Sequence, residues 1–278
     1  MASEPQWIAD TQKIADAVMH DHSVRLLPII GNGTIQTVAD LTHLDSVDAA
    51  ILPLDTLTYA QAQGLLKSSD KVSYLVQLQQ VTWVLVASPK NKTLTALAGK
   101  RIATGPTGTS GFVAGELIFN AFEVPFERVP KVGADALAAV ATGEADAALV
   151  DAVQIRKFKL NAGQFHCLPL TVPTQLDSTY HQTEVSQRDL PGLIAEDQKV
   201  DAVKTPLALM VSGNKASSSA SFKVLTEVVL AHAKELGFSQ DITADIQGWQ
   251  RHDQARKALS AFAEKQTKGS ASSTGDGQ

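Results

Sequence analysis

A loop of small residues at positions 105–110, Gly-Pro-Thr-Gly-Thr-Ser, has residue types and spacing suited to binding chemistry. An apolar run, 101–104, leads into this loop, and Thr109 or Ser110 is placed to cap the helix that follows. A strand, a tight loop and a helix start direct several backbone N–H groups into one small volume, where the helix dipole favours an anion. The loop therefore predicts a pocket for an anion or another strong hydrogen-bond acceptor.

A second loop of this kind, Gly-Asn-Gly-Thr at positions 31–34, lies in the first part of the chain. Ligands of open α/β sheets lie beyond the carboxyl ends of the strands, so one such loop in each half indicates a ligand held between the halves. Small residues also make tight turns and helix caps without any ligand. Both interpretations stay open for each loop alone, and the pair favours binding.

Two carboxylates, Asp55 and Asp151, follow apolar runs, one in each half. Each could accept a hydrogen bond from an amine or hydroxyl of a ligand, or could simply cap a helix. Trp83 and Tyr180 could stack on a ligand where the halves meet, or could be packed aromatic residues. The two aspartates could form a catalytic carboxylate pair, but no third group is placed to complete such a site, so we expect no catalytic residues.

Several nucleotide and esterase motifs are absent from the sequence. The loop 105–110 has no lysine before Thr109, which a Walker A motif requires, and no Gly-x-Gly-x-x-Gly follows the first expected strand. The Gly-x-Ser-x-Gly spacing of a nucleophile elbow is also missing around Ser110. These absences argue against nucleoside triphosphate hydrolysis, dinucleotide binding and esterase chemistry.

The composition is that of an ordinary globular protein: 278 residues, 44% hydrophobic, with a net charge of −5. This charge gives no basic surface for nucleic acid, and no apolar run is long enough to span a membrane. The single cysteine, Cys167, excludes an internal disulfide and a cysteine-based zinc site. We expect no metal and no cofactor. The first residues lack the basic and apolar regions of a signal peptide.

Apolar runs of strand length alternate with amphipathic stretches of helix length, and the alternation occurs twice. This pattern predicts an α/β fold with two lobes, built from parallel-rich sheets that helices flank. The expected division is 1–87 with 207–268 for lobe one, 88–206 for lobe two, and 269–278 for a disordered tail. The strand 82–88 is expected to leave lobe one and the strand 205–212 to return to it.

Two further segments carry expectations of their own. The apolar run 24–30 predicts a short buried strand after the first helix. The polar segment 171–203 has few apolar runs and is expected to be mostly irregular.

Three motifs resemble those of the type II periplasmic binding proteins, and more narrowly of the TAXI solute receptors that serve TRAP transporters. These motifs are Leu-Ala-Gly-Lys-Arg-Ile-Ala-Thr-Gly-Pro-Thr-Gly-Thr-Ser at 97–110, Ala-Thr-Gly-Glu-Ala-Asp-Ala-Ala-Leu-Val at 141–150, and Ser-Val-Asp-Ala-Ala-Ile-Leu-Pro-Leu-Asp at 46–55. The likeness extends over about residues 10–265. It implies a two-lobed fold of the type II class, with hinge crossovers between the lobes.

The resemblance also implies which residues bind the ligand. Carried over to this sequence, the ligand shell comprises Asn32, Gly33, Thr34, Asp55, Thr107, Thr109, Ser110 and Asp151. The family begins with a strand and a glycine-rich loop, whereas this chain opens directly on its first helix, 5–21. A trimmed pocket wall would favour a ligand that is larger or more apolar than the usual carboxylate.

The function implied is that of a periplasmic receptor that closes on a small organic ligand and delivers it to a membrane permease. We expect a monomer that is not an enzyme and binds no nucleic acid. Two alternatives stay open. One is a two-lobed α/β enzyme, such as a transferase or deaminase. The other is a binding-protein-like module adapted to a larger apolar ligand or to a protein partner, with side chains blocking its cleft.

Overall fold

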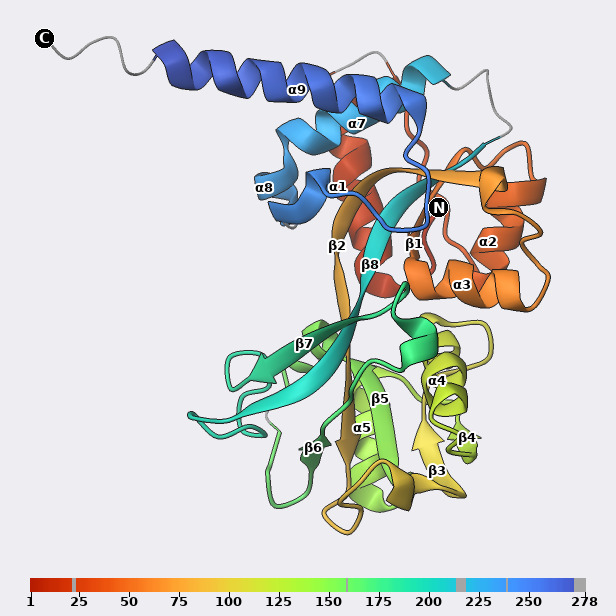
Figure 1. Cartoon of the computed structure of the whole chain (residues 1–278), viewed down its shortest axis with the longest axis vertical. Coiled ribbons are helices and arrows are strands. Elements are labelled where there is room, and N and C mark those ends of the chain that lie inside the picture. The colour runs from red at the N-terminus through yellow and green to blue at the C-terminus, as the bar shows by residue number, and fades with distance from the viewer. Residues whose placement is uncertain (22–23, 159, 214–218, 239, 273–278) are drawn as a thin grey trace, which may run out of the picture.

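The computed structural model describes residues 1–21, 24–158, 160–213, 219–238 and 240–272. In these residues a curved sheet of eight strands is flanked by helices, as Figure 1 shows. The strands are β1 (Ala49–Pro53), β2 (Val72–Ala87), β3 (Lys100–Ala103), β4 (Phe126–Val129), β5 (Ala147–Asp151), β6 (His166–Leu168), β7 (His181–Ser186) and β8 (Lys199–Ser212). They lie in the order β1-β8-β2-β5-β3-β4, with β6 added to β2 and β7 added to β8.

The helices of the described residues vary from one turn to five. They are α1 (Pro5–Asp21), α2 (Thr34–His43), α3 (Leu54–Ala62), α4 (Ser110–Ala121), α5 (Gly133–Thr142), α6 (Ala152–Ile155), α7 (Ser219–Ala231), α8 (Ala233–Leu236) and α9 (Asp253–Ser272). Short 3-10 turns of the described residues lie at Ser69–Lys71, Thr95–Leu97, Thr174–Leu176 and Gln240–Thr243. No helix of the described residues combines the length and the apolar character that crossing a membrane requires.

The two longest strands, β2 and β8, run antiparallel to each other through the whole molecule (Figure 1). We call the part with β1, α1–α3 and α7–α9 the β1 half, and the part with β3–β7 and α4–α6 the β3 half. The two ends of β2 lie in different halves. Near its start, Tyr74 pairs with Met210 of β8 in the β1 half, and near its end residues 83–87 pair with β5 in the β3 half. The sequence-based boundaries of the two lobes remain a prediction.

The alternating pattern predicted parallel-rich sheets, but among the strands of the described residues parallel pairing is confined to β3 with β4 and β3 with β5. The pairs that involve β2 and β8 are antiparallel. Strand β2 carries the chain from the β1 half to the β3 half, and β8 carries it back in the opposite direction. Their pairing shifts register between Tyr74 and Val76 and between Gln77 and Gln79. Such bulges bend a strand and increase its twist, which suits the curvature of this sheet.

The first two residues take a strand's position in the β1 half. Ala2 donates to the carbonyl of Ile29 and accepts from Gly31, while the carbonyl of Met1 accepts from Ile51 of β1. Met1 and Ala2 therefore hydrogen-bond on opposite sides, as residues of an inner parallel strand do. The chain thus has a short extended segment ahead of its first helix, which corrects the expectation that it opens directly on that helix.

The expected buried strand at 24–30 is not formed. Within the described residues only Ile30 of this segment pairs, through its isolated bridge with Ala2, and Leu27 and Ile30 are exposed. The segment is apolar, but the two residues beside it are too few to complete a ladder.

Two other expectations are corrected for part of their residues. The polar segment 171–203 contains β7 and the first five residues of β8, which pair with each other. Residues 269–272 of the expected disordered tail are helical, since α9 continues to Ser272, and 273–278 lie outside the described residues.

The buried apolar side chains form one large cluster and two smaller ones. The large cluster includes residues of both halves, such as Trp7 of α1, Leu85 of β2 and Phe119 of α4. The smaller clusters belong to single halves: one lies around β5 and α5, and the other lies around β1, α2 and α3. The halves therefore share part of their core along β2 and β8.

Candidate functional site

The start of α4, in the β3 half, is bound by a carboxylate from the β1 half. The backbone N–H of Ser110 donates to Oε1 of Glu4 at 3.2 Å, and the Ser110 hydroxyl donates to the same oxygen at 3.1 Å. Glu4 is only 9% exposed and Ser110 only 3%. The helix dipole and the free amide of the first turn favour an anion at this position. The pocket predicted for an anion thus contains an anion from the chain itself.

The two glycine-containing loops meet directly. The carbonyl of Gly108 accepts from the backbone N–H of Ile35 at 3.2 Å and from the Thr34 hydroxyl at 3.3 Å. Gly33, which caps α2, has a φ of +96°, and a Cβ atom at this residue would lie 2.7 Å from the Gly108 carbonyl oxygen. Only glycine allows both this backbone angle and this approach. The starts of α2 and α4 are therefore in contact across the junction of the halves.

A buried carboxylate lies at the start of α3, in the β1 half. Asp55 is fully buried, and its Oδ2 accepts from the Trp83 indole at 3.1 Å and from the Tyr180 hydroxyl at 3.0 Å. Its other oxygen, Oδ1, has no hydrogen-bond partner among the described residues. Burial raises the pKa of Asp55 to about 6, against the opposing effect of its hydrogen bonds from Tyr180 and Trp83. Trp83 and Tyr180 are buried as well, which supports the interpretation that they are packed aromatic residues.

Asp151 is the last residue of β5 and the cap of α6. Its Oδ1 accepts from the backbone N–H of Val153 at 3.1 Å. Burial raises its pKa to about 7, backbone hydrogen bonds lower it, and the nearby negative charge of Glu4 adds to the increase. Asp151 therefore lies within electrostatic reach of the Glu4–Ser110 contact.

The structure brings some of the predicted site residues together and leaves others at the surface. Gly33, Thr34, Ser110 and Asp151 lie at or near the contact between the halves. Thr109 caps α4, since its hydroxyl accepts from Phe112 and donates to the Pro106 carbonyl. Asn32 and Thr107 are exposed.

Sequence reasoning missed Glu4 and the carbonyl of Gly108. Glu4 precedes the proline that begins α1 and has no motif around it, and its partner is 106 residues away. The loop 105–110 was interpreted as a source of backbone N–H donors, and nothing in it marked the Gly108 carbonyl as an acceptor for the other half. Among the described residues, no three His, Cys, Asp or Glu side chains are grouped as metal ligands.

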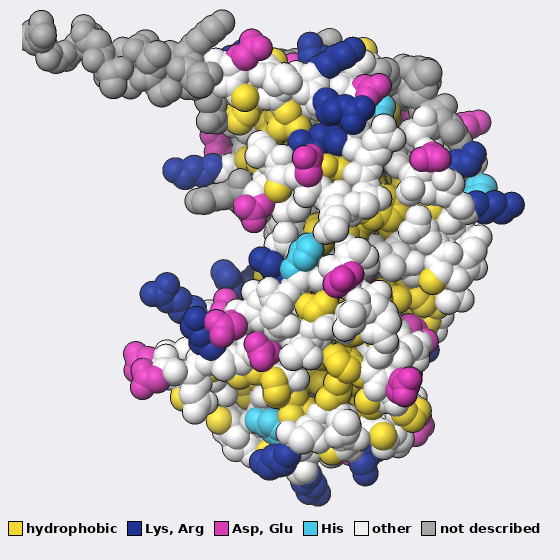
Figure 2. All heavy atoms as spheres, in the orientation of Figure 1, with side chains coloured by type: hydrophobic (Ala, Val, Ile, Leu, Met, Phe, Trp, Pro, Cys, Tyr) yellow, Lys and Arg dark blue, Asp and Glu magenta, His cyan; other side chains and the backbone are white. Residues whose placement is uncertain are grey.

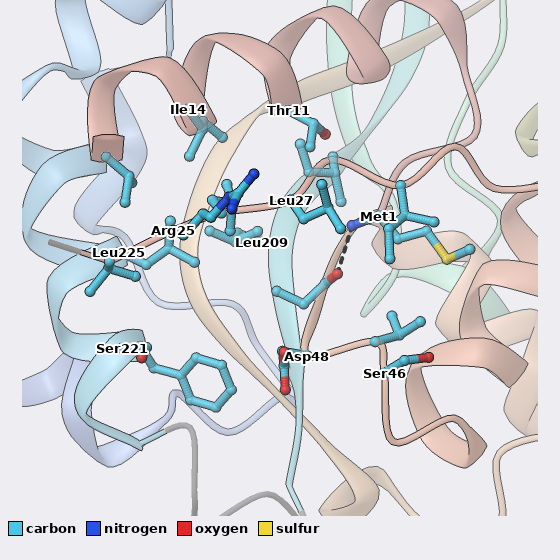
Figure 3. A pocket seen from close by; sticks show the side chains of 18 residues that line it. Met1, Thr11, Ile14, Arg25, Leu27, Ser46, Asp48, Leu209, Ser221 and Leu225 are labelled. Carbon is cyan, nitrogen blue, oxygen red and sulfur yellow. Dashed lines mark hydrogen bonds between the residues drawn. The ribbon is translucent and has the colours of Figure 1, made fainter. Parts of the chain in front are cut away.

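A cavity of about 230 Å³ lies elsewhere, within the β1 half. Figure 3 shows it between α1, the segment 24–29, the residues that lead into β1, and α7. Its walls are mainly apolar, with Ile14, Leu209 and Leu225 among them, and Arg25 and Asp48 add charge. None of the predicted site residues lines it.

One face of the molecule shows how the halves are separated at the surface. In Figure 2 the left edge is hollowed between the parts that carry α8 and β7. On the side of α3 and α4 the halves touch: the Tyr59 and Phe112 rings lie 5.9 Å apart, edge to face, and the Thr58 and Thr179 hydroxyls are 2.9 Å apart. The halves are thus joined along β2 and β8 and also through direct contacts between their helices.

Comparison with known proteins finds similarity at the level of the fold. No family model matches the sequence, and no curated protein matches it. A TctC solute-binding protein from Polaromonas has 14% identity and a TM-score of 0.52, with 94% of this chain and 86% of that chain covered. MatC from Rhodopseudomonas palustris, solved with bound malate, has 15% identity and a TM-score of 0.53, with 93% and 84% covered.

A third similar structure is the GluR0 ligand-binding core from Nostoc punctiforme with L-glutamate. It has 14% identity and a TM-score of 0.51, and 83% of this chain and 85% of that chain are covered. These identities show the fold alone. The chain has the two-lobed α/β fold of the type II periplasmic binding proteins.

Proposed function

We propose that the protein is an extracytoplasmic solute receptor that holds a small organic ligand between its two halves. The observation that carries the proposal is the Glu4–Ser110 contact, in which an acceptor from one half uses donors of the other. A solute that offers an acceptor at the same place would bind both halves at once, and so would favour their closed arrangement. The solutes bound to the similar structures, malate and glutamate, are carboxylates.

The ligand shell proposed for this receptor consists of Asn32, Gly33, Thr34, Asp55, Thr107, Thr109, Ser110 and Asp151. A micromolar dissociation constant corresponds to about −8 kcal/mol. Charge-assisted hydrogen bonds contribute about 1.5–3 kcal/mol each, so a few of them with modest apolar burial supply that affinity. The contact of Thr34 with the loop of Gly108 supports a shell drawn from both halves.

We further propose that the closed receptor delivers its ligand to a membrane permease, that it works as a monomer in the periplasm, and that it belongs with the TAXI receptors of TRAP transporters. The motifs at 97–110, 141–150 and 46–55 support this assignment. In the structure the first of them forms β3 and the start of α4, and the second forms the end of α5 and β5.

The binding test is isothermal titration calorimetry with L-malate and L-glutamate. Replacing Ser110 by alanine removes one of the two donors at the start of α4, so we expect affinity for the bound carboxylate to fall about tenfold. Ser69→Ala, in a short 3-10 turn of the β1 half, is the control and should bind like the wild type. Because Glu4 uses the same donor, unchanged affinity would remove this site from the proposal only if Ser110→Ala also leaves the affinity of the Glu4→Gln protein unchanged. The double variant Thr109→Ala with Ser110→Ala should lose more affinity, but part of its effect will come from the lost helix cap.

One observation favours a second candidate function, a binding-protein-like module for a protein partner. The junction between the halves is filled by side chains of the chain itself, with Glu4, Trp83 and Tyr180 all buried there. Such a module should show no thermal stabilisation by any small carboxylate, in the wild type or in variants of the junction.

A further inference from the structure

Glu4 occupies the donors that a solute would need. Oε1 of its carboxylate accepts two hydrogen bonds from Ser110, one from the backbone N–H and one from the hydroxyl. The contact is almost completely buried, so a solute cannot reach these donors while Glu4 remains there.

The chain holds Glu4 on a short tether. Ala2, two residues before it, is fixed between Ile29 and Gly31, and Pro5, the next residue, begins α1. A group held this close to its acceptor site binds at a high effective concentration without losing the translational freedom that a solute loses. The contact therefore competes strongly with a free solute for the same two donors.

We propose that Glu4 is a tethered competitor of the solute, which helps to hold the two halves together in the absence of ligand and must leave before a carboxylate can bind to Ser110. This inference rests on the proposed receptor function and adds the regulation of that same site. A competitor role explains how the junction can be filled by side chains of the chain itself and still be the place where the proposed receptor binds its solute.

A purely structural role for Glu4, as an acceptor that satisfies the first turn of α4, is the alternative. It predicts that removing the charge lowers stability and leaves solute affinity unchanged or weaker. A competitor predicts tighter binding on removal. The two roles therefore differ in the sign of the change in affinity.

The test compares Glu4→Gln with the wild type. Glutamine keeps the shape of the side chain and removes its charge, so the contact to Ser110 weakens without a cavity. Calorimetry with L-malate and L-glutamate should show about tenfold tighter binding to the variant, because a charge-assisted hydrogen bond is exchanged for a neutral one. Small-angle scattering of the solute-free variant should show a larger radius of gyration than the wild type. Glu127→Gln, at an exposed position of β4, is the matched control for loss of one glutamate charge.

The outcomes separate this inference from the receptor proposal. If both proteins bind the carboxylate equally well and scatter alike, Glu4 is no competitor and the receptor proposal stands. Weaker binding to Glu4→Gln also overturns the competitor. If Glu4→Gln expands but neither protein binds either carboxylate, the closing contact is upheld and the receptor proposal fails for these solutes.

Discussion

Polar residues at the junction are buried, and they are satisfied largely by partners from other parts of the chain. Asp55 of α3 relies on Trp83 and Tyr180, and Glu4 relies on Ser110. A buried carboxylate with incomplete hydrogen bonding is costly to ionise, which is why the pKa values of Asp55 and Asp151 are raised to about 6 and about 7. These groups make the stability of the protein depend on pH.

The direction of that dependence follows from proton binding. An unfolded aspartate releases its proton near pH 4, whereas Asp55 and Asp151 keep theirs to about pH 6 and about pH 7 in the folded protein. The folded state therefore binds more protons in this interval, and its free energy of unfolding falls as pH rises from about 4 to about 7. Urea denaturation at a series of pH values should show this fall.

Asparagine can still cap the helix but does not titrate. Between about pH 4 and about pH 7, the free energy of unfolding of Asp151→Asn should therefore decrease by roughly 2–4 kcal/mol less than that of the wild type. Asp135→Asn, an exposed aspartate in the first turn of α5, should keep the wild-type profile. A variant Asp151→Asn with an unchanged profile would show that Asp151 ionises normally in the folded protein.

At the scale of elements, the starts of α2 and α4 are held together by backbone contacts. The Gly108 carbonyl accepts from both Ile35 and Thr34, and Gly33 leaves the space that this approach needs. A side chain at Gly33 would clash with the opposite loop. The contact between the halves is thus encoded by glycines as much as by polar side chains.

This clash is testable by comparing two glycines. Gly33→Ala introduces a Cβ 2.7 Å from the Gly108 oxygen at a positive φ, whereas Gly64→Ala meets a positive φ of +70° with nothing within 4 Å. In both variants the positive φ lowers the free energy of unfolding by about 1 kcal/mol, and only in Gly33→Ala must the two loops also move apart. Chemical denaturation should therefore show a loss at least 1 kcal/mol greater for Gly33→Ala. Equal losses would mean that the loops do not touch in solution.

Elements with strong apolar periodicity were predicted well from the sequence. Helix α1 has the predicted bounds, 5–21, because its apolar residues recur at helical spacing after Pro5. Strand β7 was missed because its sequence, His-Gln-Thr-Glu-Val-Ser, places mostly polar residues at a half-exposed edge. The segment 24–30 has the composition of a strand, but a strand also needs neighbours, which composition does not reveal.

The candidate site was only partly predictable for the same reason. Glycines and small residues identified the two loops, since these residue types report on local backbone conformation. The partner of Ser110 is set by tertiary structure across 106 residues, and no local pattern marks Glu4. The sequence therefore indicated where the halves offer hydrogen-bond donors, but it did not indicate which group accepts from them.

At the scale of the whole molecule, two halves are joined by long strands and closed by contacts at one side. β2 and β8 run through both halves, and a large apolar cluster continues along them. Relative movement of the halves would bend these strands near the register shifts of β2, where the ladder is irregular. The cavity of the β1 half lies apart from that junction and provides an internal control for where a solute binds.

Nuclear magnetic resonance of the backbone amides during addition of L-malate and L-glutamate tests the central claim most directly. If a solute lies between the halves, the largest shift changes should include Ser110 of α4 and Ile35 of α2, one from each half. The amide of Leu225, at the separate cavity, should change little. Changes confined to one half, changes centred on Leu225, or no changes with either solute would contradict the account.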